Sequence, residues 1–242
     1  QHQVNQSGDI LGSEALLRWH HPQRGMVYPA DFIPLAEESG LIIPIGQWVM
    51  ITACSQMQSW LDQGFDLQHI SINVSPKQFR QTDFIRNVQA ALSQSGLAAH
   101  KLMLEITEGI VIDNIDDTIN KMDSLKKIGV RFSIDDFGTG YSSLAYLKRM
   151  PLSELKIDRS FVQDLISSEN DAVIVSATIN LAHNLGLKIV AEGVEDEETL
   201  SRLKEYGCDI AQGYYINKPL TSEELDTWLE ESQWQLLSSN VE

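Results

Sequence analysis

The chain has few basic residues and only two cysteines. Its 242 residues contain 34 Asp and Glu against 18 Lys and Arg, which gives a formal net charge of −16. Polymeric nucleic acid and anionic membrane surfaces both require basic patches, so we expect contact with neither. A small phosphate-bearing ligand is not excluded, because divalent cations held by carboxylates invert the local charge. Cys54 and Cys208 are too few for a disulfide framework, and we expect buried thiols.

Several common site motifs are also missing. The six histidines show no paired spacing typical of a zinc site, and the sequence has no dinucleotide-binding glycine motif and no P-loop. The adjacent pair His20-His21 is only a weak indication of a metal site. The glycine-rich segment Phe137-Gly138-Thr139-Gly140 is by itself a weak indication of phosphate binding, which gains weight because it follows two aspartates.

No apolar run is long enough to cross a bilayer, and no low-complexity tract or flexible linker divides the chain. We therefore expect one domain over residues 1–242. Because the chain begins with Gln1 and not with Met, we expect it to be cut from a longer protein. Its length matches the roughly 250 residues of an eightfold α/β barrel.

The order of the predicted elements also favours a barrel. A four-residue turn at 5–8 separates extended segments at 3–4 and 9–12, and so short a turn can join only antiparallel strands. Extended and helical patterns then alternate, which is typical of a parallel sheet covered by helices. We predict an α/β fold, a TIM-like (β/α)8 barrel with one antiparallel strand. Further strands are expected at 70–74, 102–106, 130–134, 155–157, 187–191 and 208–211, and helices at 30–39, 45–61, 83–95, 116–128, 172–185, 197–206 and after a capping box at 221–224.

Polar side chains stand at the carboxyl ends of the predicted strands. In an α/β barrel these ends meet on one face, which carries the active site. Some of the carboxylates interrupt apolar runs, as in Leu102-Met103-Leu104-Glu105-Ile106, and a buried carboxylate is costly unless it is paired or binds a metal. The residues are Glu14, Asn73, Glu105, Asp135, Asp136, Lys156, Glu192 and Gln212.

Five carboxylates that converge on one mouth repel one another, and divalent cations would offset this repulsion. Oxygen ligands suit Mg²⁺ or Mn²⁺, and the adjacent Asp135 and Asp136 suit two ions roughly 3.5–4 Å apart with one bridging carboxylate. Asn73 adds a neutral oxygen ligand. Each residue alone could equally be a helix cap or a solvated loop residue, but together they favour a site for two divalent cations.

Eight short motifs follow one another along the chain. They are Glu14-Ala15-Leu16-Leu17-Arg18-Trp19, Ile72-Asn73-Val74-Ser75, Leu104-Glu105-Ile106-Thr107-Glu108, Asp135-Asp136-Phe137-Gly138-Thr139-Gly140, Leu155-Lys156-Ile157-Asp158, Ala191-Glu192-Gly193-Val194-Glu195, Gln212-Gly213-Tyr214 and Lys218-Pro219-Leu220. In this order they resemble the EAL domain family, the cyclic di-GMP phosphodiesterases, from the first turn to Leu229. The family's TIM-like barrel with one antiparallel strand agrees with the short first turn.

The resemblance implies hydrolysis of cyclic di-GMP to linear pGpG by two-metal-assisted in-line attack of water. Lys156 would orient and polarise this water, and Glu192 would be the general base. One cation would be held by Glu14, Asn73, Glu105 and Asp135, and the other by Asp135, Asp136 and Glu192.

The resemblance also assigns residues around this centre. Glu108 would anchor the loop that begins at Asp136, and this loop would serve a homodimer interface through the segment Phe137, Gly138, Thr139 and Gly140. Gln212 would also join the water network of the metal site. Substrate contacts are implied for Gln1, Leu16, Arg18, Asp158, Glu195, Gln212 and Pro219.

Two stretches depart from the family pattern, and neither contains an expected metal ligand. Gln1-His2 stands where the family has Gln-Pro on its first strand, so the resemblance implies that the start of this strand is missing. Ile216 and Asn217 replace a Phe and a small residue before Lys218-Pro219, which would alter the guanine pocket.

Two function classes stay open. The first is an active phosphodiesterase, and the second is an EAL-type receptor, non-catalytic or conditionally inactive, that binds cyclic di-GMP. Receptors of this kind usually lack some of the carboxylates, whereas here the set is complete. The resemblance implies a sensory or GGDEF-type domain N-terminal to this one. It also implies a location in the cytoplasm or at the cytosolic face of a membrane-anchored protein.

Overall fold

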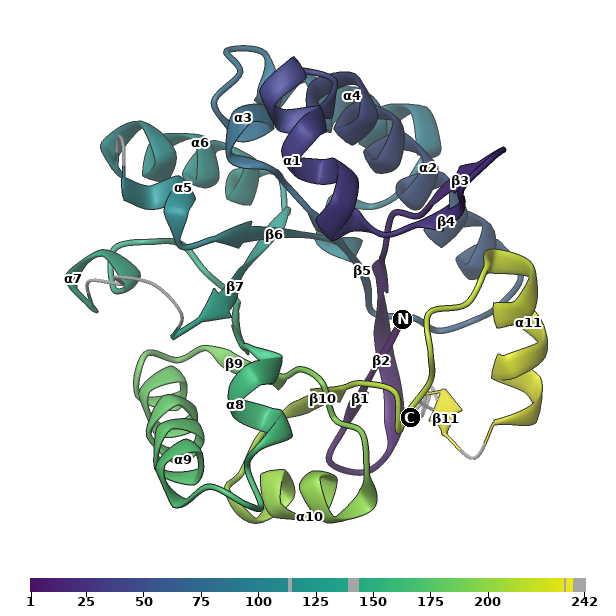
Figure 1. Cartoon of the computed structure of the whole chain (residues 1–242). Coiled ribbons are helices and arrows are strands. Elements are labelled where there is room, and N and C mark those ends of the chain that lie inside the picture. Colours follow the sequence, from purple (N-terminus) through teal and green to yellow (C-terminus); the bar gives the residue numbers. More distant parts are fainter. Residues whose placement is uncertain (113–114, 139–143, 233, 237–242) are drawn as a thin grey trace, which may run out of the picture.

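Strands close into a barrel at the centre of the molecule, and helices surround it (Figure 1). The structure is a computed structural model that describes residues 1–112, 115–138, 144–232 and 234–236. The strand order is β1-β10-β9-β8-β7-β6-β5-β2, and pairing of β1 with β2 completes the ring. The predicted barrel is therefore confirmed.

The first two strands form the expected antiparallel hairpin. β1 (His2–Asn5) and β2 (Asp9–Ala15) flank a turn in which Asn5 Oδ1 accepts hydrogen bonds from Ser7 N and Asp9 N, both at 2.9 Å. Gly8 closes the turn with a φ of 88°, a conformation that glycine adopts without strain. Because β1 is antiparallel to β10 as well as to β2, it is the one reversed strand of the barrel.

The remaining barrel strands run parallel to one another, and each lies within a few residues of its predicted range. The largest differences are in β2 and β7, which each extend three residues beyond the predicted end, so Glu14, Asp135 and Asp136 lie in the strands and not after them. A register irregularity between Ile134 and Phe137 accompanies the extension of β7. The strands are β5 (His69–Asn73), β6 (Leu102–Thr107), β7 (Arg131–Phe137), β8 (Glu154–Ile157), β9 (Lys188–Ala191) and β10 (Ile210–Gln212).

The outer helices also follow the prediction, and Thr221 and Glu224 form the expected capping box of α11. The sequence did not predict the short elements between them. The main helices are α1 (Pro29–Ser39), α2 (Ile42–Asp62), α4 (Phe84–Ser95), α6 (Ile115–Lys127), α9 (Glu169–Asn184), α10 (Glu197–Glu205) and α11 (Ser222–Glu231). The unpredicted elements are β3 (Trp19–His21), β4 (Gly25–Val27), α3 (Pro76–Phe79), the 3-10 turn Ala99–Lys101, α5 (Gly109–Ile112), α7 (Leu144–Leu147), α8 (Arg159–Gln163) and β11 (Gln235–Leu236).

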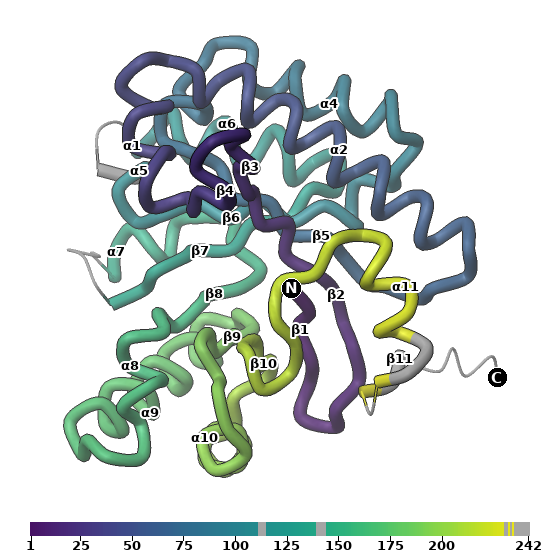
Figure 2. The backbone as a smooth tube through the Cα atoms, turned by 45° about the vertical axis from the view of Figure 1, so that its right-hand side comes forward, coloured from purple at the N-terminus to yellow at the C-terminus, as the bar shows by residue number. Residues whose placement is uncertain are grey.

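The N-terminus lies beside the segment that leads into α11 (Figure 2). Two hydrogen bonds hold these distant parts of the chain together: Gln1 Nε2 donates to Asn217 O at 2.9 Å, and His2 N donates to Asn217 Oδ1 at 3.0 Å. The segment from 217 to 221 therefore forms one wall of the barrel mouth.

The barrel has an apolar outside and a polar inside. Ile70 and Ile72 of β5 belong to the core between barrel and helices, whereas His69, Ser71 and Asn73 alternate with them along the same strand. None of the described helices has the length and apolar character that a membrane crossing requires. Cys54 and Cys208 are buried thiols, as expected, and burial raises the pKa of each to about 12.

Candidate active site

Lys156 lies at the centre of the polar cluster at the carboxyl end of the strands. Its Nζ lies 2.5 Å from Glu192 Oε1, 2.8 Å from Glu105 Oε2, 3.4 Å from Glu14 Oε2 and 3.6 Å from Asp135 Oδ1. The side chains of Lys156 and Glu105 are completely buried. Five different barrel strands, or the residue directly after one, thus bring these charges together.

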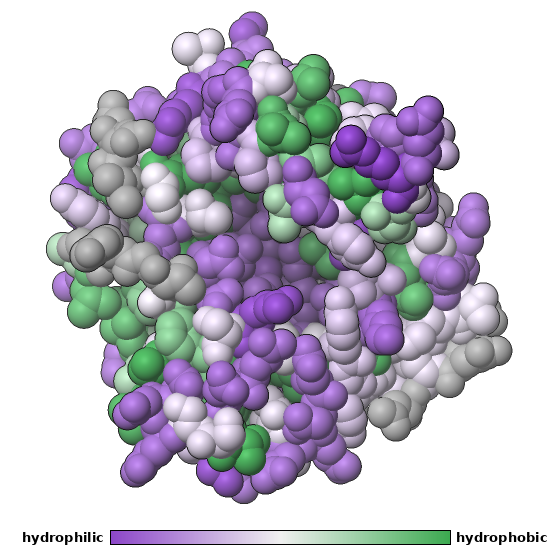
Figure 3. All heavy atoms as spheres, viewed as in Figure 1, coloured by the Kyte–Doolittle hydropathy of each residue, from purple (hydrophilic) through white to green (hydrophobic). Residues whose placement is uncertain are grey.

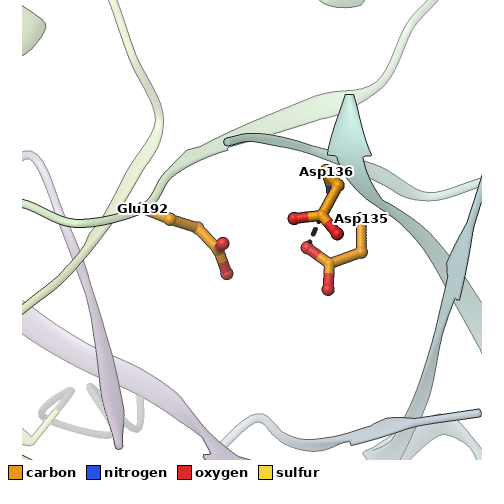
Figure 4. A group of neighbouring side chains, drawn as sticks. All are labelled: Asp135, Asp136 and Glu192. Carbon is orange, nitrogen blue, oxygen red and sulfur yellow. Dashed lines mark hydrogen bonds between the residues drawn. The ribbon is translucent and has the colours of Figure 1, made fainter. Parts of the chain in front are cut away.

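Asp135, Asp136 and Glu192 offer a cluster of carboxylate oxygens that lie within 4.8 Å of one another (Figure 4). Glu192 directly follows β9 and points toward the two aspartates of β7, with β8 between the two strands. Asp136 has a φ of 55°, and its backbone N donates to Asp135 Oδ1 at 3.0 Å. Left-handed backbone at a non-glycine residue costs on the order of 1 kcal/mol, so the surrounding structure must hold Asp136 in this conformation.

Burial and mutual repulsion shift the pKa values of the acids. Burial raises the pKa of Glu192 to about 8, and Asp135 and Glu14 act in the same direction against the opposing charge of Lys156. Burial and Asp135 raise the pKa of Asp136 to about 6. Burial alone would lower the pKa of Lys156, but the carboxylates around it outweigh this effect and raise it. Lys156 therefore stays protonated, and the single positive charge of its ammonium group is shared among several carboxylates.

The donor set fits divalent cations. Five carboxylates face one ammonium group, which leaves a formal charge of −4 when all are ionised, and two divalent cations would neutralise it. Glu105 Oε1 is buried and finds no hydrogen-bond partner among the described residues. All the ligand atoms are oxygens, which suits Mg²⁺ or Mn²⁺.

Two amides hold the Glu14 carboxylate. Asn73 Nδ2 donates to Glu14 Oε1 at 2.6 Å, and Gln212 Nε2 donates to Glu14 Oε2 at 2.5 Å. Because Asn73 uses its nitrogen for this bond, Oδ1 is the atom that it would offer to a cation. The structure thus brings Asn73 and Gln212 into contact with Glu14.

A cavity of about 860 Å³ opens beside Glu14. In the space-filling view the mouth of the barrel is a hollow lined by hydrophilic residues (Figure 3). Four of the residues expected to contact substrate line the cavity: Gln1, Leu16, Arg18 and Pro219.

The other three residues expected to contact substrate do not line this cavity. Asp158 Oδ1 accepts a hydrogen bond from Ser160 N at 3.0 Å and caps α8. Glu195 accepts a hydrogen bond from Gln163 Nε2 at 2.9 Å. Gln212 is buried inside the barrel next to Glu14.

A family model described as EAL domain matches residues 1–219 of the chain. The chain belongs to the EAL domain family. It is 47% identical over 219 residues to the bifunctional diguanylate cyclase/cyclic di-GMP phosphodiesterase MucR of Pseudomonas aeruginosa, covering 90% of this chain and 32% of MucR. It is 38% identical to the oxygen sensor protein DosP of Escherichia coli, covering 93% of this chain and 28% of DosP. The chain thus spans about a third of the length of these curated relatives.

Solved structures match over most of the chain. The PaMucR phosphodiesterase in its c-di-GMP complex has a TM-score of 0.90 and 46% identity, covering 93% of this chain and 92% of that chain. The EAL enzyme Bd1971, in its cAMP- and cyclic-di-GMP-bound form, has a TM-score of 0.89 and 38% identity, covering 93% of this chain and 62% of that chain. The family predicted from the eight motifs is therefore confirmed.

Several aromatic side chains of this EAL domain line the cavity and were not predicted as site residues. Tyr28, Trp48 and Tyr214 line it and are each more than half exposed. The guanidinium of Arg18 lies 5.9 Å from the centre of the Tyr28 ring. In the sequence, Trp48 falls within a predicted helix, where an aromatic residue is more readily assigned to the core. Only the fold shows that it faces the cavity.

In this EAL domain, Glu108 anchors the start of the glycine-rich loop. Gly138 N donates to Glu108 Oε1 at 3.2 Å, and Phe137 is buried at the end of β7. Gly138 has a φ of 102°, and a Cβ there would lie 3.1 Å from the Phe161 ring, so glycine is required. Thr139 and Gly140 lie outside the described residues.

Proposed function

We propose that the chain is a cyclic-guanylate-specific phosphodiesterase that hydrolyses cyclic di-GMP to linear pGpG. The observation that carries the proposal is the convergence of five carboxylates, Asn73 and the buried Lys156 at the barrel mouth. Two relatives support it by their names: MucR, and the cyclic di-GMP phosphodiesterase NbdA of P. aeruginosa at 43% identity. The complete acid set favours an enzyme over a receptor.

The cofactors in this proposal are two divalent cations, Mg²⁺ or Mn²⁺. Asp135, Asp136 and Glu192 would hold one of them, and their oxygens already lie close together. The other would be held by Glu14, Asn73, Glu105 and Asp135. When bound, such ions supply Lewis-acid activation of a water and stabilise negative charge on the phosphodiester.

Two residues of the chain would act on the attacking water. Lys156 stays protonated and can donate hydrogen bonds that orient the water oxygen toward phosphorus. Glu192 lies 2.5 Å from Lys156 and can accept the water proton as its general base. The water oxygen bonds to phosphorus and the P–O3′ bond breaks. The proton that Glu192 took from the water balances the proton that O3′ takes up to become the free hydroxyl of pGpG, so the step consumes one water and no other reactant.

The cavity beside Glu14 would hold the nucleotide. Arg18 would place a positive charge near a phosphate, and Gln1, Leu16 and Pro219 would complete the contacts. The exposed ring of Trp48 offers a surface for stacking by a guanine base.

The assembly of the full-length protein is part of the same proposal. We expect a homodimer that uses the loop anchored by Glu108, and a sensory or GGDEF-type domain N-terminal to this one. The bifunctional name of MucR, of which the chain covers 32%, supports such a neighbour. The location would be the cytoplasm or the cytosolic face of a membrane-anchored protein.

The test is product formation from cyclic di-GMP with Mg²⁺, Mn²⁺ or chelator. Wild type should produce pGpG only with metal, and Glu14→Ala should not. Glu205→Ala is the matched control, because Glu205 is an exposed carboxylate at the end of α10, outside the site. Binding of cyclic di-GMP without turnover, with either metal, would contradict the proposal of an enzyme and support a receptor.

A further inference from the structure

A line of buried hydrogen bonds crosses the inside of the barrel and ends on Glu14. His69 Nε2 lies 2.8 Å from Gln3 Oε1, Gln3 Nε2 lies 2.9 Å from Gln212 Oε1, and Gln212 Nε2 lies 2.5 Å from Glu14 Oε2. His69, Gln3 and Gln212 are each at most 3% exposed. Strands β5, β1 and β10 thus contribute one side chain each. In this line of hydrogen bonds His69 contacts Gln3, Gln3 contacts Gln212, and Gln212 contacts the carboxylate on β2.

The direction of these bonds follows from the carboxylate at the end. An ionised carboxylate only accepts hydrogen bonds, so Gln212 must present its NH₂ group to Glu14 and its carbonyl oxygen to Gln3. Gln3 must then donate to Gln212, which turns the Gln3 carbonyl oxygen toward His69. His69 must therefore donate from Nε2. Every donor in the line points toward Glu14.

The surroundings of His69 fix its proton on Nε2. Burial, together with the charge of Arg131, lowers the pKa of His69 to about 3, so the ring is neutral and has a single N–H. Its Nδ1 is buried and has no hydrogen-bond partner within the described ranges. The ring packs against Gly12, where a Cβ would lie 2.9 Å from Nδ1 and 2.6 Å from the His69 carbonyl oxygen. The ring position therefore requires glycine at residue 12.

We propose that His69 and Gln3 are positioning residues that hold Gln212, and through it the Glu14 carboxylate, in the orientation that binds a divalent cation. This inference rests on the proposed function, in which Glu14 is a metal ligand. Gln212 and Asn73 each hold one oxygen of Glu14, so a Gln212 amide that turns over would place its carbonyl oxygen against the carboxylate. Hydrogen-bond partners behind a metal ligand commonly affect metal affinity in this way.

The test measures Mn²⁺ affinity by electron paramagnetic resonance in the absence of substrate. Gln3→Leu and His69→Leu should each weaken Mn²⁺ binding by about 10- to 100-fold. His69→Gln places an amide donor near the position of Nε2 and should restore affinity to near wild type. Val88→Ala is the stability control, because Val88 is fully buried on α4 outside the barrel. It should lower the melting temperature and leave Mn²⁺ affinity unchanged.

A double variant separates positioning from a merely structural role. Because His69 acts through Gln3, His69→Leu should cause no further loss of Mn²⁺ affinity when Gln3→Leu is already present. Losses that multiply, or a His69→Gln protein that binds as weakly as His69→Leu, would overturn the inference. A wild-type chain that neither binds Mn²⁺ nor forms pGpG would instead contradict the proposed function.

A spectroscopic signature gives a second readout. In a long-range ¹H–¹⁵N spectrum of the wild type at neutral pH, His69 should be the neutral tautomer with the proton on Nε2. A proton on Nδ1 would break the line of donors and overturn the inference even if the enzyme is active.

Discussion

The acidic cluster around Lys156, which we call the floor of the site, and the exposed lining of the cavity, which we call its wall, are built in different ways. The floor consists of charged side chains from the ends of barrel strands, and Lys156 and Glu105 within it are completely buried. The wall consists of side chains from loops and helices, such as Tyr28 and Trp48, and both are more than half exposed. The floor is therefore held rigidly by its own ion pairs and hydrogen bonds, whereas the wall has few constraints. We therefore expect the floor to determine the reaction chemistry and the wall to determine substrate affinity.

Removal of Lys156 should have the largest effect. Lys156→Met should lower kcat by about 10²- to 10⁴-fold, because a positioned group beside the water and the reacting phosphate is lost. Steady-state hydrolysis of cyclic di-GMP at saturating Mg²⁺ measures this change in kcat, with Lys188→Met as the charge-matched control, because Lys188 is exposed on β9 and pairs with Asp209 away from the site. A Lys156→Met enzyme that keeps more than a tenth of wild-type kcat would show that the floor does not carry the chemistry.

The floor should also make metal-free stability depend on pH. The pKa of Glu192 in the folded chain is about 8, above the ordinary value of 4.5, so the folded state retains a proton that the unfolded chain has lost. The contribution of Glu192 to stability should thus fall as pH rises toward 8. This contribution falls by about 1.6 kcal/mol between pH 6.5 and 8, because the slope of about 1.4 kcal/mol per pH unit flattens near the folded pKa. Bound cations favour the ionised form and should offset it.

Melting temperatures with chelator and with Mg²⁺ across this pH range test the prediction. The gain from Mg²⁺ should increase with pH. Each pH is measured for the wild type and for Glu192→Gln, and the difference isolates Glu192. This is needed because burial lowers the pKa of His2 and of His69 to about 3 and that of the Gln1 amine to about 6, so these groups make stability rise over the same range. Melting curves that stay parallel at all pH values would contradict a cation-dependent floor.

The floor of the site could be predicted from the sequence far better than the wall. Strand periodicity and motif order placed Glu14, Glu105, Asp135 and Lys156 at strand ends, and the fold brings the three carboxylates within 3.6 Å of the Lys156 ammonium group. The extension of β7 could not be predicted, because Asp135 and Asp136 are poor strand residues that only tertiary structure holds there.

The wall depended on features that a sequence pattern does not contain. Strands β3 and β4 are three residues each, too short for an alternation signal, and they carry the chain from Arg18 to Tyr28. The line from His69 to Gln3 joins residues 66 positions apart, and no local pattern indicates it. The topology of the fold, and not the local strand or helix propensity of the sequence, determines both the short strands and this contact.

A change in the wall should alter affinity and leave the chemistry intact. Trp48→Ala should raise KM by about 10-fold, because stacking of a base on an aromatic ring is worth about 1–3 kcal/mol. The value of kcat should stay near wild type. Leu35→Ala is the control, since Leu35 is an exposed apolar residue on α1 outside the cavity. A fall in kcat at unchanged KM would break the division between floor and wall.

A change in the scaffold should affect neither property. Ser168 caps α9 by accepting a hydrogen bond from Asp171 N at 3.3 Å. Ser168→Ala should lower the free energy of unfolding by about 1 kcal/mol, as loss of such a cap does. Denaturant unfolding measures this change, and both kcat and KM should match wild type. Altered kinetic constants would show that the site depends on α9 more closely than its contacts indicate.

A crystal structure of the chain with Mn²⁺, with anomalous diffraction to locate the ions, shows directly whether the acids hold two cations. We expect two anomalous peaks about 3.5–4 Å apart among Glu14, Glu105, Asp135, Asp136 and Glu192. A floor without a peak at saturating Mn²⁺, with Lys156 still paired to Glu105 and Glu192, would contradict the central claim that these acids are assembled to hold two divalent cations.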